Sequence, residues 1–334
     1  MPKQTKLDLA REYVTRYPRH SQREVARILQ AEHPHTWPSW ESVYMCVRRV
    51  CGGATTSGHE NARHKPPPSY QKQKIASGTS IPALPKSKAS DWKPYKLDGK
   101  RILVLSDVHV PYHDTTALSL ALKWGKSRNA DTVFLNGDIA DFYSISRFET
   151  NPEERDFPGE LDSVRQFLRY VRTQFPKARI VYKLGNHEER WWHWMWRKAP
   201  ELMGCDFMDF TTMTGCNDLG IQVVSDQRIV MVGKLPVLHG HEWRAGISTP
   251  VNPARGAFLK AIECAMQGHL HRTSEHTETS LLNKTITCWS TGCLCDLHPE
   301  YARVNRWNHG FAEIEMHNGD FAVENKRILH GKVF

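Results

Sequence analysis

Five short segments of this sequence concentrate Asp, His and Asn side chains. The segments are Asp107-Val108-His109, Gly137-Asp138-Ile139-Ala140-Asp141, Gly185-Asn186-His187-Glu188, His239-Gly240-His241 and Gly268-His269-Leu270-His271. Carboxylate, amide and imidazole groups are ligands of divalent transition metals. One Asp-x-His would indicate little, but five such segments in one chain predict a polynuclear metal site. A metal site of this kind in turn predicts hydrolytic chemistry.

A short apolar run precedes each of these segments. The runs are RILVLSD, DTVFLNGD, RIVYKLGN, LPVLHG and ECAMQGH. Apolar runs bounded by Gly or polar residues are typical of buried strands. Ligands of open α/β sheets gather at the carboxyl ends of the strands. We therefore expect five strands, each delivering metal-binding side chains at its C-terminal end.

The basic charge of the chain is concentrated at one end. The 334 residues carry a net charge of +9, and 40% of them are hydrophobic, which is enough for one large domain and one small one. Residues 1–100 contain 18 Lys and Arg against 8 Asp and Glu, whereas residues 101–334 contain 27 against 28. This asymmetry predicts an N-terminal appendage that meets a polyanion, either nucleic acid or a membrane surface. The alternative is a basic face that is merely solvated.

Residues 6–50 show the apolar spacing of three short helices. The second is expected to start at a capping box, with Ser21 as the N-cap and Glu24 as the third helical residue. The third helix carries Arg48 and Arg49, and three short helices with a basic third element resemble a helix-turn-helix module. Any small helical bundle would show the same spacing, so DNA binding by this part remains one of two interpretations.

The composition of the chain changes at two places. Residues 1–53 are expected to form the helical domain, and residues 54–100, rich in Pro, Lys and Ser, a basic linker. From 101 to 334 strand and helix patterns alternate, with helices expected over 115–128, 159–175, 188–198 and 253–263. After residue 271 the pattern predicts antiparallel strands, with Asn318-Gly319 as a hairpin turn. The expected architecture is two packed sheets with helices outside.

The sequence gives no indication of export or of a membrane-spanning segment, and of the two polyanions nucleic acid is the expected partner rather than a membrane. None of the eight cysteines forms a C-x-x-C pair, and a chain of this length has no need of disulfides, so we expect reduced thiols in an intracellular protein. No apolar run reaches membrane-spanning length, and the N-terminal residues lack the apolar core of a secretory signal. The expected location is the cytoplasm, or the host cytoplasm if the protein is phage-encoded. The oligomeric state is left open.

The order of the five segments resembles that of the calcineurin-like metallophosphoesterases. The resemblance covers roughly residues 101–310 and leaves the N-terminal hundred residues outside. It implies an α/β fold, namely a four-layer α/β/β/α sandwich, with a two-metal centre. Phe142 stands where the protein-phosphatase branch has an arginine. His239 is followed by Gly240-His241, whereas that branch has Gly-Gly after the corresponding histidine. The chain therefore looks more similar to the bacterial, archaeal and phage phosphodiesterase and nuclease branch.

The resemblance also implies a ligand set. One ion would take Asp107, His109 and His271, the other Asn186, His239 and His269, and Asp138 would bridge both. A shared carboxylate agrees with the physics, because two divalent cations a few ångströms apart repel each other. The mixture of oxygen and nitrogen ligands suits Mn, Fe, Zn, Co or Ni better than Mg or Ca, and Mn²⁺ is expected first. A hydroxide held between the ions would be the nucleophile.

His187 resembles the catalytic histidine of the family, which protonates the leaving oxygen or steadies the phosphoryl charge. Asp141 would hold its other ring nitrogen, although a turn or helix-cap role is the alternative.

In the fourth segment either imidazole, that of His239 or that of His241, could face a metal. The family pattern favours His239 and leaves His241 to face substrate or to support the ligands. Glu188 is expected to be a helix-start residue rather than a catalytic group.

Arginines and tryptophans near the segments have two interpretations each. Arg147, Arg190 and Arg272 follow metal segments, and at least one is expected to clamp a phosphate. Four tryptophans that follow the third segment are expected to pack in the core, with a base-stacking wall as the alternative. These are Trp191, Trp192, Trp194 and Trp196.

Three functions are compatible with these observations. The first is a dinuclear metal-dependent phosphodiesterase that acts on nucleic acid, with the basic N-terminal region as the nucleic-acid contact. The second keeps the enzyme and changes the substrate to a cyclic nucleotide or another small phosphoester, with the N-terminal domain used for localisation. The third is a non-catalytic DNA-binding or scaffold protein, which the complete set of ligand residues disfavours.

Overall fold

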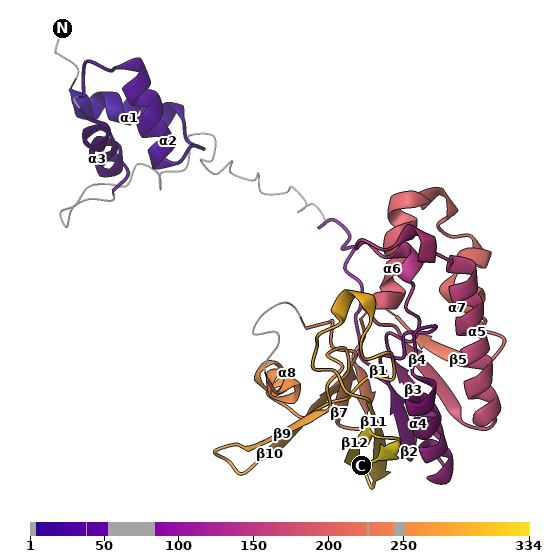
Figure 1. Cartoon of the computed structure of the whole chain (residues 1–334). Helices are drawn as coiled ribbons and strands as arrows, with labels where there is room; N and C mark the ends of the chain where they lie inside the picture. Colours follow the sequence, from indigo (N-terminus) through magenta and orange to yellow (C-terminus); the bar gives the residue numbers. More distant parts are fainter. Residues whose placement is uncertain (1–4, 38, 53–83, 226, 244–250) are drawn as a thin grey trace, which may run out of the picture. The chain divides into compact units, whose positions relative to one another are not determined.

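The computed structural model describes residues 5–37, 39–52, 84–225, 227–243 and 251–334. The chain forms two compact units, Met1–Lys88 and Ala89–Phe334 (Figure 1). Within the described ranges, no helix is both long enough and apolar enough to cross a membrane.

The first unit contains three helices, α1 (Lys6–Arg16), α2 (Gln22–Glu32) and α3 (Trp40–Val50). The predicted capping box is present, because the Glu24 backbone N–H donates to Ser21 Oγ at 3.2 Å and the Ser21 N–H donates to Glu24 at 2.7 Å. Thr5 and Asp8 form a second capping box at the start of α1. Each of these helices therefore starts where a side chain three residues away satisfies the free backbone N–H groups.

Packing of α1 and α2 against α3 closes the core of this unit. Val25, Leu29, Val43 and Val47 are fully buried in it. The indole of Trp40 stacks on the Tyr44 ring, with a centroid distance of 5.1 Å. The basic side chains remain outside this core, as in a small helical bundle with one apolar and one polar face on each helix.

The larger sheet of the second unit has seven strands in the order β13-β12-β11-β2-β3-β4-β5. Its strands are β2 (Arg101–Leu105), β3 (Thr132–Asn136), β4 (Arg179–Lys183), β5 (Ile221–Val224), β11 (Gly310–His317), β12 (Asp320–Leu329) and β13 (Lys332–Val333). Strands β2 to β5 run parallel, and β11 to β13 add an antiparallel edge. Asn318 and Gly319 both have positive φ between β11 and β12, which confirms the predicted hairpin turn.

The smaller sheet has six strands in the order β1-β6-β7-β8-β10-β9. They are β1 (Tyr95–Lys96), β6 (Val230–Val232), β7 (Leu235–Leu238), β8 (Ala265–Gln267), β9 (Ser274–Thr279) and β10 (Thr285–Ser290). Strand β1 pairs with β6, so the chain joins this sheet before residue 101, where the domain was expected to begin. Local sequence could not reveal that start, because only pairing with β6 makes Tyr95 and Lys96 a strand.

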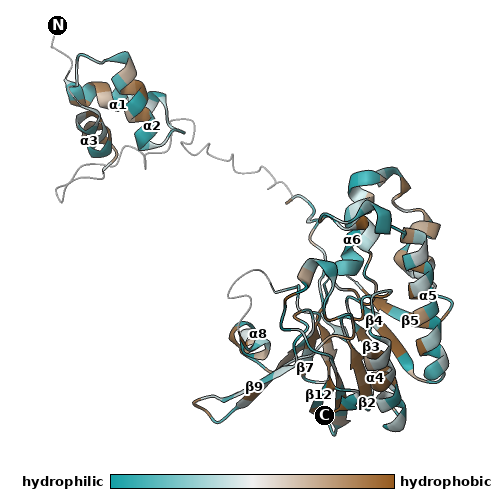
Figure 2. Cartoon of the chain, in the orientation of Figure 1, coloured by the Kyte–Doolittle hydropathy of each residue, from teal (hydrophilic) through white to brown (hydrophobic). Residues whose placement is uncertain are grey.

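The two sheets pack face to face, and the helices cover their outer faces. Ile102 and Val104 of β2 point into the core between the sheets, whereas Leu103 and Leu105 point toward the helices. The helices are α4 (Thr115–Ser127), α5 (Phe157–Gln174), α6 (Asn186–Lys198) and α7 (Phe210–Thr214) on the large sheet, and α8 (Pro253–Ala261) against β8 and β10. Figure 2 shows the hydrophobic strands inside these layers. The predicted α/β/β/α sandwich is confirmed.

Short 3-10 turns link these elements at Tyr143–Ile145, Pro152–Glu154, Pro200–Leu202, Asp206–Met208 and Glu300–Ala302.

Helix α6 packs its tryptophans mainly inward. Trp191 stacks on Phe157 at a centroid distance of 5.6 Å, and Trp192 stacks on Phe210 at 5.5 Å, while Trp196 is 59% exposed. Core packing therefore accounts for the first two of these rings.

Candidate metal centre

All five predicted segments follow the C-terminal ends of strands. Three of the strands, β2, β3 and β4, belong to the large sheet, and two, β7 and β8, belong to the small sheet. The segments therefore meet where the parallel parts of both sheets end, as the sequence pattern predicted. Neither sheet alone could supply the whole set of side chains.

The carboxylates and imidazoles of these segments converge. Asp138 Oδ2 lies 3.1 Å from His239 Nε2 and 3.9 Å from His109 Nε2. Asp107 Oδ1 lies 3.1 Å from His271 Nε2 and 4.0 Å from His239 Nε2. These five residues are buried, so their polar atoms face one another instead of water.

Two of the imidazoles have their outer ring nitrogen fixed by a hydrogen bond. His239 Nδ1 donates to the Asn136 carbonyl at 2.8 Å, and His109 Nδ1 pairs with Asp141 Oδ2 at 2.9 Å. Each bond favours the tautomer whose Nε2 carries a free lone pair directed at the centre.

The donor set fits divalent metal ions. Among the described side chains, Asn186 Oδ1 is buried and has no hydrogen-bond partner. Buried polar atoms are rarely left in this state unless another group satisfies them. Ligand atoms of His109, Asp138 and His187 lie within 4.8 Å of one another, and so do those of Asp138, His239 and His269. Asp138 belongs to both groups, which is the position that a bridging carboxylate requires.

Charge balance in the centre indicates how protons and metals compete. Burial lowers the pKa of His239, but the surrounding carboxylates, Asp138 foremost and then Asp107, together raise that pKa to about 10. Asp107 acts in the same way on His271, whose pKa also rises to about 10 despite burial. Burial and the neighbouring His239 lower the pKa of His269 to about 4. Metal ions would take the places of the protons on His239 and His271, so metal binding releases protons.

Asp141 supports two histidines rather than one. Its carboxylate lies 2.9 Å from His109 Nδ1 and 3.3 Å from His187 Nδ1. Its backbone carbonyl accepts from His187 Nδ1 at 2.9 Å. The structure thus places Asp141 at His187, as expected from the sequence, and also at a metal ligand, which the sequence did not indicate.

Arg190 is the predicted arginine that reaches the centre. Its guanidinium donates to His187 Nε2 at 3.0 Å and to the Asp141 carbonyl at 2.9 Å. The other two candidates lie differently. Arg147 is exposed and its guanidinium stands 5.0 Å from the Phe148 ring centroid, and Arg272 is partly buried near Arg306.

Several ligand residues adopt a backbone conformation that side chains disfavour. Asp107, His109, Asp138, His269 and His271 all have φ between 52° and 66°. Left-handed residues other than Gly, Asn or Asp are uncommon and cluster at functional sites. Gly185 makes the close approach possible, because a Cβ there would lie 2.3 Å from Asp138 Oδ1.

Glu188 anchors two of the metal segments to each other. Its fully buried carboxylate accepts backbone N–H groups of Asp138 at 3.0 Å, Ile139 at 2.7 Å, Ala140 at 2.9 Å and Gly185 at 2.7 Å. It also accepts from the Tyr182 hydroxyl at 2.7 Å. Glu188 is therefore a helix-start residue, as predicted, and in addition it holds the loop that carries Asp138.

A second carboxylate, Glu242, anchors the fourth segment in a similar way. It accepts from the His239 N–H at 3.1 Å and the Gly240 N–H at 2.6 Å, and Lys183 Nζ lies 2.5 Å from it. Burial opposes its ionisation, but the Lys183 ammonium lowers its pKa to about 2. Sequence reasoning missed this pair, because Lys183 and Glu242 are far apart in the chain and lie outside the motifs.

His241 lies beside two carboxylates. Its Nε2 lies 3.2 Å from Glu189 Oε1, and its Nδ1 lies 3.7 Å from Glu242 Oε2. This geometry matches a supporting role, which was one of its two predicted roles.

Two cysteines adjoin the metal ligand His271. Cys295 Sγ lies 3.9 Å from His271 Nδ1, and Cys293 is close to both Cys295 and His271. Ligand atoms of His109, His271 and Cys295 lie within 4.8 Å of one another. The C-x-C spacing was the only signal in the sequence that could have singled out these thiols.

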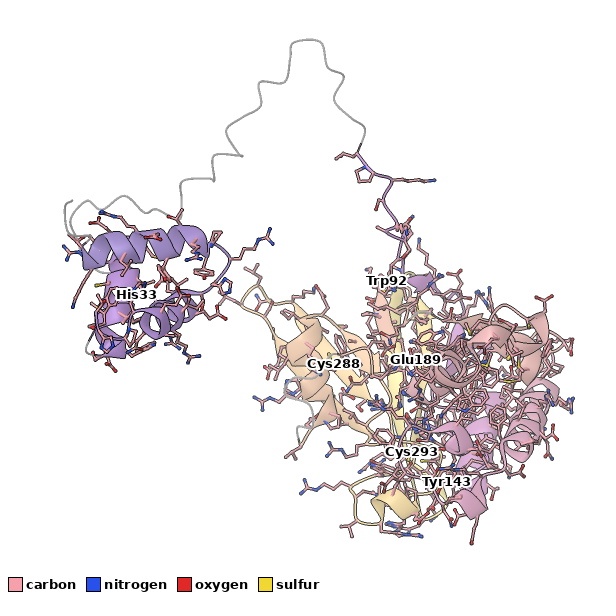
Figure 3. All side chains as sticks on the ribbon, turned by 90° about the horizontal axis from the view of Figure 1, so that it is seen from above. His33, Trp92, Tyr143, Glu189, Cys288 and Cys293 are labelled. Atoms are coloured by element: carbon pink, nitrogen blue, oxygen red, sulfur yellow. The ribbon has the colours of Figure 1, made fainter. Side chains whose placement is uncertain are left out.

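Two cavities open beside the centre. One, of about 690 Å³, reaches Asn186, His187 and Arg190. The other, of about 380 Å³, reaches His109 and Cys295. Both are lined by Asp141, Tyr143, Glu300 and Tyr301. Figure 3 labels Tyr143, which borders both cavities, and Cys293.

Comparison with known proteins gives one matching family model, described as calcineurin-like phosphoesterase, over residues 100–272. The Gene 54 proteins of Mycobacterium phages L5 and D29 are each 26% identical over 181 residues, which are 52% of this chain and 69% of theirs.

Among solved structures, zinc-bound Vps29 from Entamoeba histolytica matches with 13% identity and a TM-score of 0.35, covering 70% of this chain and 96% of that one. The phosphoesterase Yfce from E. coli matches with 14% identity and a TM-score of 0.31, covering 64% and 88%. A dimetal phosphatase from Danio rerio matches with 12% identity and a TM-score of 0.33, covering 67% and 95%.

Proposed function

The chain belongs to the calcineurin-like phosphoesterase family, and on this premise we propose that it hydrolyses phosphodiester bonds in nucleic acid at a centre of two divalent metal ions. The observation that carries this proposal is the convergence of the five segments. Asp138 shares close contacts with histidines of three other segments, namely His109, His187 and His239.

The ligand residues would hold the ions in two groups around Asp138. Asp107, His109 and His271 form one group, and Asn186, His239 and His269 form the other. When bound, divalent ions polarise phosphoryl oxygens and lower the pKa of water, and Mn²⁺ is our first candidate.

The remaining polar residues have separate tasks. His187 is within reach of Asp138, and we assign to its Nε2 the donation of a proton to the leaving oxygen. Arg190 donates to this nitrogen in the structure, so the assignment requires the guanidinium to turn to the phosphate and leave Nε2 free to carry the proton. Asp141 fixes the orientation of the His187 ring through its carbonyl. Arg190 contacts His187 and lines the larger cavity, where its guanidinium would bind a phosphoryl oxygen.

Nucleic acid is the proposed substrate because of the N-terminal unit. Arg23 and Arg27 of α2 and Arg48 and Arg49 of α3 are exposed. Exposed arginines on adjoining helices of a three-helix unit suit phosphate contacts, and the excess of positive charge in residues 1–100 adds to the attraction.

A small nucleotide is the second candidate substrate. The observation that favours it is the size of the cavities, about 380 and 690 Å³, which is the range of small-ligand sites. In that case the N-terminal unit would serve localisation.

The test is a substrate panel with added Mn²⁺: bis-p-nitrophenyl phosphate, p-nitrophenyl phosphate, and labelled single- and double-stranded DNA. Cleavage of the diester and of DNA is the expected result. Cleavage of small esters with DNA left intact would replace the first candidate by the second.

A truncated chain tests the role of the N-terminal unit. The cut belongs after Lys88, because β1 at Tyr95–Lys96 is part of the second unit. We expect residues 89–334 to keep hydrolysis of the small diester and to lose DNA affinity, and the DNA affinity of the full chain to fall steeply with salt. Equal DNA affinity of both proteins would refute this role.

A further inference from the structure

The larger cavity beside the metal centre is bordered by two exposed aromatic rings. Phe148 is 65% exposed and Tyr301 is 64% exposed, and both line this cavity of about 690 Å³. They come from segments far apart in the sequence. Other rings of this unit are buried, such as Phe142 at 0% and Phe210 at 2%. Two large exposed rings at the mouth of one cavity indicate a ligand surface rather than a core.

Both rings are held in place by the surrounding structure. The Tyr143 hydroxyl accepts the Asn151 N–H at 2.8 Å and so closes the loop that carries Phe148. The Tyr301 ring contacts Trp307 at a centroid distance of 6.3 Å, and Trp307 packs edge-on against His271 at 4.1 Å. The position of Tyr301 is thus linked to a candidate metal ligand.

The charges of the cavity indicate what would lie between the rings. Glu149 and Glu300 line it, and two carboxylates would repel a second phosphate group. The same carboxylates would accept N–H groups from the edge of a base. The positive group, Arg190, lies beside His187, and both line the cavity together with Asn186. The lining therefore combines one cation that suits a phosphate with aromatic and acidic groups that suit a base.

We propose that this cavity is a nucleobase subsite, in which one unstacked base next to the scissile phosphate packs against Phe148 and Tyr301. This inference rests on the proposed phosphodiesterase function and narrows its substrate. A base inside a stacked duplex cannot enter the cavity without being flipped out. The preferred substrates are therefore single-stranded nucleic acid or nucleoside phosphodiesters.

Two chromogenic esters separate base recognition from hydrolysis. Thymidine 5′-p-nitrophenyl phosphate carries a base, and methyl p-nitrophenyl phosphate does not. The ratio of their kcat/KM values in the full chain measures the contribution of the nucleoside, and the ring variants show how much of it comes from the base. We expect Phe148→Ala and Tyr301→Ala each to lower this ratio about tenfold, mainly through KM, as for loss of one base–aromatic stack. Phe148→Trp should restore it.

Phe207→Ala is the matched control, because Phe207 is 64% exposed but borders neither cavity. It should leave the ratio unchanged. A ratio that is unaffected in Phe148→Ala and Tyr301→Ala, or lowered equally in the control, would overturn the subsite.

Equilibrium binding supplies a readout that does not depend on turnover. Adenosine 5′-monophosphate and ribose 5-phosphate differ by the base alone, and calorimetry on the full chain gives both affinities. We expect the nucleotide to bind more tightly than the sugar phosphate. Phe148→Ala should lower the ratio of the two affinities about tenfold. Equal affinity for both ligands would refute the subsite. Absence of metal-dependent hydrolysis of the methyl ester would instead refute the proposed function.

Discussion

The helical unit and the metal centre reach their conformations by different routes. In the helical unit the starts of α1 and α2 are set by side chains three residues away, as in the pair Ser21 and Glu24. In the metal centre the loop that carries Asp138 is set by Glu188, which comes from the segment after the next strand. Local contacts suffice where the backbone adopts its preferred conformation. Long-range contacts are needed where ligand residues are left-handed.

The contrast has an energetic basis. A capping side chain satisfies N–H groups that water would otherwise satisfy, so its net contribution is small. The carboxylate of Glu188 is fully buried, and its partners have no access to water as a substitute. Loss of such a group leaves several buried donors unpaired. The two regions should therefore respond very differently to equivalent substitutions.

The largest expected effect is a loss of turnover without a loss of bound metal, on substitution of His187. His187→Ala removes the proposed proton donor and should lower turnover of bis-p-nitrophenyl phosphate by about 10²- to 10⁴-fold. The metal ligands remain, so the bound metal should be unchanged. Steady-state kinetics and elemental analysis measure the two quantities. His193→Ala is the control, because His193 is an exposed residue of the same helix. Loss of turnover in the control, or loss of metal with His187, would contradict the assignment.

The next largest effect is a loss of stability on substitution of Glu188, whose carboxylate binds backbone N–H groups of a distant loop. Glu188→Gln replaces one of the two acceptor oxygens by an NH₂ group that faces backbone N–H donors. The free energy of unfolding of the second unit should fall by about 3 kcal/mol, measured by urea titration. Glu201→Gln, at an exposed carboxylate, should change it by less than about 0.5 kcal/mol. Similar values for both variants would remove the distinction between the two regions.

The smallest effect tests the local anchor. Ser21→Ala should destabilise α2 by about 1 kcal/mol, which corresponds to about fivefold faster amide hydrogen exchange in that helix. Thr15→Ala, an exposed change inside α1, should be neutral or slightly stabilising because Ala is the better helix former. Hydrolysis should be unaffected by either change. A Ser21→Ala effect as large as that of Glu188→Gln would show that the helical unit depends on more than local caps.

The same contrast explains what could be predicted from the sequence. Strand ends, helix positions and the cap at Ser21 follow from periodicity and local side-chain chemistry, and the structure has them. The resemblance to a family supplied the candidate ligand residues, and the structure brings the carboxylates and imidazoles among them together. The pairing of Lys183 with Glu242 and the second task of Asp141 were not predicted. These contacts join residues that are adjacent only after both sheets have packed.

The central claim is that the five segments form a two-metal hydrolytic centre. Titration of the metal-free full chain with Mn²⁺, with bound metal and hydrolysis of bis-p-nitrophenyl phosphate followed together, tests this claim most directly. We expect hydrolysis to rise with bound metal and to reach its maximum at two ions per chain. Full activity at one ion per chain, or activity that persists after the metal has been removed by a chelator, would contradict the account.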